Sequence, residues 1–186
     1  APEDRPAMRE MVGKGHLDMQ ALAGMGREEL VSVLSTLASD YAAWIEEQRA
    51  RIGNDVKGHD EQAGAALERC MTVQTRLLEG IEVLDRNDKA LTAFRFANQA
   101  MALQRVHSMF ALARRRGELK ELADFEKREN RSWRPFQLAF MLLSIPSLAD
   151  PSHRDRIEPV EAYADLLWFP TGGGKTFVGC HAVEKI

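Results

Sequence analysis

The chain has 186 residues, of which 45% are hydrophobic and 28% are charged. This balance excludes a chain that is disordered throughout, and a chain of this length buries a core without disulfides or a structural metal. The formal net charge of -3 excludes a globally basic nucleic-acid binder but leaves room for a local basic groove. The two cysteines, Cys70 and Cys180, are too far apart to suggest a zinc site or a disulfide framework.

The beginning of the chain is rich in glycine and proline. Residues 1–26 hold two prolines and four glycines among scattered Met and Leu residues. We expect a mobile lead-in there, with room for one short helix.

Three successive segments carry apolar residues at helical spacing. They cover residues 27–52, about 59–84 and about 89–116, with a turn at residues 86–88 in which Asn87 or Asp88 can cap the third helix. The third segment is apolar around most of its circumference, which predicts burial by neighbours on several sides. Together they predict a helical bundle or array for residues 27–130.

Gly117 is expected to end the third helix, and residues 118–130 are expected to form a short charged helix. The arginines just before Gly117 have two open interpretations. The run Arg114-Arg115-Arg116 is either a solvated helix end, where the helix dipole favours cations, or a contact for DNA phosphates.

After Ser132 the pattern changes. Residues 133–146 predict a strongly apolar helix that Pro146 ends, and a loop with further prolines follows. The longest apolar run, 136–146, is too short to span a bilayer, which takes about 20 residues. Residues 163–169 form an apolar run between helix breakers, which predicts a buried strand.

A glycine-rich loop follows that expected strand. It reads Pro170-Thr171-Gly172-Gly173-Gly174-Lys175-Thr176 and precedes an expected helix over residues 177–186. In such a loop the backbone N–H groups surround the phosphates of ATP, Lys175 reaches the β- and γ-phosphates, and the Thr176 hydroxyl binds Mg²⁺. The strict pattern is not met because Phe169 occupies its leading glycine position, so a glycine-rich surface turn with a solvated lysine stays as the alternative.

The tetrapeptide Arg134-Pro135-Phe136-Gln137 lies upstream of the loop. It resembles the R-P-[YF]-Q element of superfamily 2 motors, in which the Gln amide reads the adenine edge. An amide suits that task because it donates and accepts hydrogen bonds. Alone the tetrapeptide is a weak signal, with Gln137 as a capped or exposed helix residue as the alternative; together with the glycine loop it is a strong one.

Longer stretches point to a narrower family. Residues 94–101, 133–150 and 164–176 resemble the DrmA helicases of the DISARM anti-phage system. The resemblance implies a bacterial, cytoplasmic DNA translocase of superfamily 2 that uses ATP and Mg²⁺. It also implies a DrmB-like partner subunit and a DNA methyltransferase beside it. Gln137 and Gly172 to Thr176 are the site residues that it carries over; the tail after Thr176 departs from the family.

One part of a motor is missing from the sequence. The Asp-Glu pair of this chain, Asp60-Glu61, precedes the glycine loop and follows no buried strand, so we reject it as the acidic box of an ATPase. We therefore predict no catalytic residue here and a fragment that is inactive alone. A small P-loop kinase is a weak alternative because the loop lies near the end of the chain.

The fold prediction is a mainly α chain that ends in the strand, loop and helix that open a RecA-like domain. The expected divisions are the lead-in (1–26), the helical domain (27–130) and the truncated ATP-binding start (131–186). The predicted function is the ATP-binding N-terminal part of a DNA motor in phage defence. The alternative is a helical interaction module whose glycine loop is vestigial.

Overall fold

A computed structural model of the chain describes residues 17–157. These residues form the helices α2 (Met19–Gly24), α3 (Arg27–Arg51), α4 (Asp60–Arg86), α5 (Asp88–Arg115), α6 (Pro135–Ala149) and α7 (Arg154–Ile157), and the short 3₁₀ helices η2 (Leu122–Phe125) and η3 (Arg128–Arg131). The mainly α fold is confirmed for this part of the chain. The expected strand, glycine loop and final helix lie outside the described residues.

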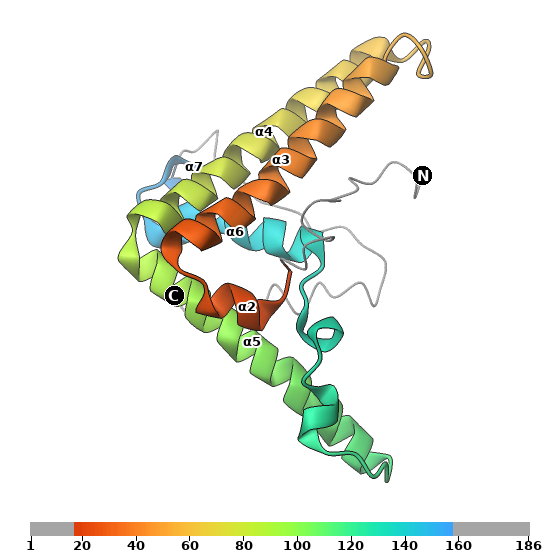
Figure 1. Ribbon diagram of the computed structural model, residues 1–186. Helices are drawn as coiled ribbons and strands as arrows, with labels where there is room; N and C mark the ends of the chain where they lie inside the picture. Colours follow the sequence, from red (N-terminus) through yellow and green to blue (C-terminus); the bar gives the residue numbers. More distant parts are fainter. Residues whose placement is uncertain (1–16, 158–186) are drawn as a thin grey trace.

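The helices form two long arms that meet at an elbow (Figure 1). Helices α3 and α4 pack side by side as an antiparallel hairpin, and α5 leaves the elbow in another direction. Helix α2 lies along α5, α6 packs on α4, and η2 and η3 pack on the far half of α5. Helices α2 to α6 therefore all contribute to the elbow.

Local capping explains where the chain changes direction. The Asn87 side chain accepts hydrogen bonds from the backbone N–H groups of Lys89 (3.0 Å) and Ala90 (3.1 Å), so it caps α5 as expected. Asp18 caps α2 by accepting from the backbone N–H of Gln20. The short helix expected within the lead-in is thus present, and it lies in the core because Met19 and Leu22 are completely buried.

The core sits at the elbow. Its fully buried large side chains come from five helices: Met19 and Leu22, Leu30, Leu34 and Leu37, Leu84, Met101, and Leu138 and Leu142. Far along the second arm, Val106 and Ala113 of α5 form a smaller cluster with Phe125. No helix within residues 17–157 combines the length and the hydropathy needed to cross a membrane.

Two expectations for residues 89–130 are wrong. Phe96 and Leu103 of α5 are each 54% exposed, because the neighbouring elements cover only part of that helix. Residues 118–130 form two 3₁₀ helices in place of one charged helix. Asp124 accepts a hydrogen bond from the backbone N–H of Glu121 (2.9 Å), which closes a three-residue turn and lets Phe125 pack against α5.

Helix α6 approaches α4 unusually closely. A Cβ atom at Gly80 of α4 would lie 2.1 Å from the Leu142 carbonyl oxygen of α6. Pro146, four residues after Leu142, has no N–H to donate to that carbonyl. The expectation that Pro146 ends the helix is wrong, because α6 continues to Ala149. The helix lacks only the hydrogen bond from residue 146 to the Leu142 carbonyl, and that carbonyl is the one that faces Gly80.

Candidate functional site

Gln137 lies in the first turn of α6. Pro135 occupies the first helical position, where its fixed φ fits and its missing N–H costs nothing. The Gln137 side-chain oxygen accepts a hydrogen bond from the backbone N–H of Arg134 (2.9 Å), and the side chain is only 4% exposed. The amide is therefore buried and oriented, and its oxygen serves as a helix cap. The capping interpretation is confirmed, while a role in reading adenine stays a prediction.

Trp133 anchors the start of α6 in the core. Its backbone N–H donates to the Leu17 carbonyl (2.9 Å), and its indole N–H donates to the side-chain oxygen of Asn98 on α5 (2.8 Å). Asn98 is completely buried, and its amide nitrogen donates to the Phe94 carbonyl (2.9 Å). Sequence reasoning missed this role, although an asparagine among the apolar residues of 94–101 was a signal for it.

Asp18 ties α2 to the same region. Its carboxylate accepts from Nε (2.9 Å) and Nη2 (3.3 Å) of Arg131, the last residue of η3. An isolated backbone bridge pairs Asp18 with Ser132. The start of the described chain thus holds the segment that leads into α6.

Two arginines, Arg105 and Arg134, lie near each other at this end of α6. Arg105 of α5 donates to the Asn130 carbonyl (2.6 Å). Burial lowers the pKa of Arg105, and the nearby guanidinium of Arg134 lowers it further. The two guanidinium groups are thus close enough for each to disfavour the charge of the other.

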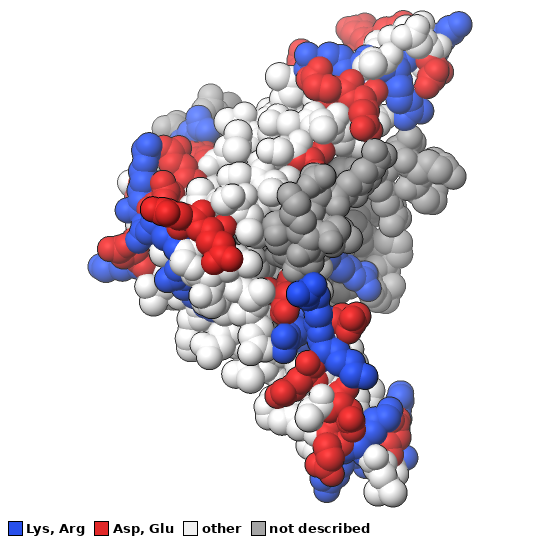
Figure 2. Space-filling view, viewed as in Figure 1, with Lys and Arg blue, Asp and Glu red and all other residues white. Residues whose placement is uncertain are grey.

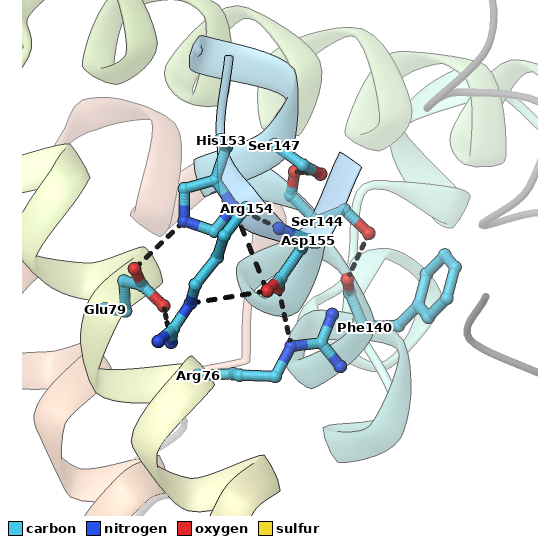
Figure 3. Close-up of polar contacts among 8 residues, drawn as sticks. All are labelled: Arg76, Glu79, Phe140, Ser144, Ser147, His153, Arg154 and Asp155. Atoms are coloured by element: carbon cyan, nitrogen blue, oxygen red, sulfur yellow. Dashed lines mark hydrogen bonds and ion pairs between the residues drawn. The ribbon is translucent and has the colours of Figure 1, made fainter. Parts of the chain in front are cut away.

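A second polar site joins α4 to α7 (Figure 3). Arg76 Nε lies 3.0 Å from Asp155 Oδ2, and both side chains are at least nine-tenths buried. Beside them, His153 Nε2 lies 3.0 Å from Glu79 Oε1, and Arg154 Nη2 lies 3.6 Å from Glu79 Oε2. These five residues link the end of the described chain to the middle of α4.

The arrangement in this cluster does not suit catalysis. The backbone N–H of Asp155 donates to His153 Nδ1 (3.2 Å), so the ring proton is on Nε2 and is donated to Glu79. The nearby hydroxyls of Ser144 and Ser147 donate to main-chain carbonyls of α6. No group of His, Cys, Asp and Glu side chains within residues 17–157 could hold a metal ion. We interpret the cluster as structural.

The glycine-loop candidates lie outside the described residues, and the rejected acidic pair lies at the start of α4. Thr171, Gly172, Gly173, Gly174, Lys175 and Thr176, including the predicted Mg²⁺ ligand, lie outside the described residues. Asp60 and Glu61 are exposed in the first turn of α4, at the far end of the hairpin. That position agrees with their rejection as an acidic box.

The ends of both arms carry charges of both signs (Figure 2). Arg114, Arg115 and Arg116 are exposed at the end of α5, and Arg114 lies over the Phe110 ring at 5.7 Å. Lys120 pairs with Glu118 nearby, at 2.5 Å. Alternating charges of this kind favour the solvated helix end over a phosphate-binding surface.

Comparison with known proteins shows similarity to a DrmA protein. The chain is 34% identical over 166 residues to "DISARM protein DrmA" from Bacillus paralicheniformis (strain ATCC 9945a / NCIMB 11709 / CD-2). The chain is related to DrmA. The match covers 88% of this chain but only 14% of the length of that DrmA. No family model matches the chain.

Proposed function

We propose that this DrmA-related chain supplies the ATP-binding start of a DNA motor that acts in anti-phage defence. The similarity to DISARM protein DrmA over 88% of the chain carries the proposal. The sequence adds the glycine loop with Lys175 and Thr176 for the phosphates and Mg²⁺, and Gln137 for the adenine. The Gln137 amide is held in one orientation by the backbone N–H of Arg134, an arrangement compatible with that last assignment.

The proposal places catalysis beyond this chain. Hydrolysis in such motors needs an acidic pair that holds Mg²⁺ and positions water, and Asp60-Glu61 does not qualify. The chain is thus proposed to bind ATP and Mg²⁺ without turning ATP over. DNA and a DrmB-like subunit are proposed as partners of the whole motor, in the cytoplasm.

Substitution of Lys175 tests the proposal. Calorimetric titration of the 186-residue chain with ATP and Mg²⁺ should give saturable binding, which Lys175→Ala abolishes because the β- and γ-phosphates lose their cation. Lys57→Ala is the matched control, because Lys57 is exposed at the hairpin loop. ATP binding that survives Lys175→Ala, or that is absent from the wild-type chain, would contradict the proposal.

The second candidate is a helical interaction module. The long hairpin of α3 and α4, which extends well beyond the core, favours it (Figure 1). Co-migration of the chain with a DrmB-like subunit in size-exclusion chromatography, without any ATP binding, would select this candidate.

A further inference from the structure

A series of hydrogen bonds connects the middle of α5 with Gln137. The Phe94 carbonyl accepts from Asn98 Nδ2 (2.9 Å), and Asn98 Oδ1 accepts from Trp133 Nε1 (2.8 Å). Arg134 follows Trp133 directly, and its backbone N–H donates to Gln137 Oε1 (2.9 Å). Asn98, Trp133 and Gln137 are 0%, 2% and 4% exposed, so water does not compete for these bonds.

Asn98 is an unusual residue for its position. It lies on the buried face of α5 between Phe94 and Met101, where an apolar residue would fill the core without a hydrogen-bonding requirement. A buried amide instead requires partners in fixed places. The partners of Asn98 place Trp133, and with it the backbone that orients Gln137.

The orientation of a glutamine amide decides which purine it accepts. Adenine offers a donor at N6 beside the acceptor N7, whereas guanine offers acceptors at O6 and N7. An amide with its oxygen toward N6 and its NH₂ group toward N7 pairs with adenine. A rotated amide would set donor against donor at N6 and acceptor against acceptor at N7, so it would lose its preference for adenine. Rotation of Gln137 would bring its NH₂ group against the Arg134 N–H, two donors facing each other.

We propose that Asn98 is a positioning residue for purine selection: through Trp133 and the Arg134 N–H it holds the Gln137 amide in the orientation that selects adenine over guanine. The inference rests on the proposed function, because it requires that Gln137 reads the base. It adds a residue on a different helix, 39 positions earlier, to the determinants of nucleotide specificity.

Trp133→Phe is the principal test, because it removes the indole N–H and keeps a ring in the core. The ratio of ATP to GTP affinity, measured by calorimetry on the 186-residue chain, should fall by about tenfold, the net worth of about one hydrogen bond to the base. Inorganic tripolyphosphate should bind as before, because the phosphate loop is unchanged. A structural role alone would weaken all three ligands together.

Asn98→Leu should change the ratio in the same direction. The double variant should be no worse than the more affected single variant, because both residues act in one series. Val106→Ala is the matched control: Val106 is buried on the same helix but packs in the separate cluster with Phe125. It should lower stability and leave the ratio unchanged.

The outcomes separate the two proposals. An unchanged ATP-to-GTP ratio in folded Trp133→Phe would overturn the positioning role. If Asn98→Leu does not fold, the ratio measured for Trp133→Phe decides the question by itself. A wild-type ratio in Gln137→Ala, or no ATP binding by the wild-type chain, would instead refute base reading by Gln137, and the inference would fall with it.

Discussion

Gly80 shows how one residue sets the distance between two helices. The Leu142 carbonyl of α6 faces its Cα, and a Cβ there would lie 2.1 Å from the carbonyl oxygen. Alanine normally stabilises a helix relative to glycine, but here it would push α6 away from α4. We expect Gly80→Ala to lower the free energy of unfolding by about 1–3 kcal/mol, the usual cost of overpacking.

A second glycine of α4 provides the control for that experiment. Nothing lies within 4 Å of a Cβ built at Gly64. Gly64→Ala should therefore raise the free energy of unfolding by about 0.5–1 kcal/mol, the ordinary helix-propensity gain. Urea denaturation followed by circular dichroism measures both, and equal effects of the two substitutions would refute the close-approach argument.

At the scale of elements, the Arg76–Asp155 pair holds α7 against α4. Both side chains are nearly excluded from water, so removal of one leaves the other charge buried. Arg76→Met or Asp155→Leu should each lower the free energy of unfolding by about 3–5 kcal/mol, and the double substitution by less than the sum. Thermal unfolding of the wild-type chain, the two single variants and the double variant measures the coupling between the two residues in a double-mutant cycle.

An exposed pair on the same helix is the comparison. Arg86 and Glu82 of α4 form an ion pair at 2.5 Å with side chains 77% and 52% exposed. Arg86→Met should change the free energy of unfolding by no more than about 1 kcal/mol, because water and salt screen such pairs. A loss at Arg86 as large as at Arg76 would show that burial does not decide these energies.

At the scale of the whole molecule, stability is concentrated at the elbow. In the part of the hairpin beyond the core, the buried hydrophobic residues are Ile45 of α3 and Leu67 of α4. We expect amide hydrogens of the hairpin end to exchange faster than those near Leu37 and Leu84, because local opening there exposes little apolar surface. Hydrogen-exchange mass spectrometry measures this, and uniform protection along both helices would contradict it.

Much of the helical fold could be predicted, because local patterns are sufficient for it. The periodicity of residues 27–116 indicated α3, α4 and α5 nearly to their ends, and Asn87 was recognisable as a cap. The exposure of Phe96 and Leu103 was not predictable, since it depends on which neighbours cover α5. Pro146 also misled the prediction, because proline usually ends a helix.

The candidate site, like the fold, has parts that the sequence could predict and parts that it could not. Gln137 was identified from the tetrapeptide in which it lies, and the glycine loop from its spacing, because both signals are contiguous in the chain. The links from Asn98 to Trp133 and from Arg76 to Asp155 join residues 35 and 79 positions apart. No periodicity relates such pairs, so sequence reasoning had no means to find them.

By itself, the sequence determined the helical segments, the turn at Asn87 and the candidate phosphate loop, because these follow from spacing and backbone preference among neighbouring residues. Only the tertiary structure decided that Gly80 faces a carbonyl of α6, that Asn98 holds Trp133 and that Asp155 reaches Arg76. Those contacts form when helices far apart in the chain pack together, and the shape of the shared core selects them.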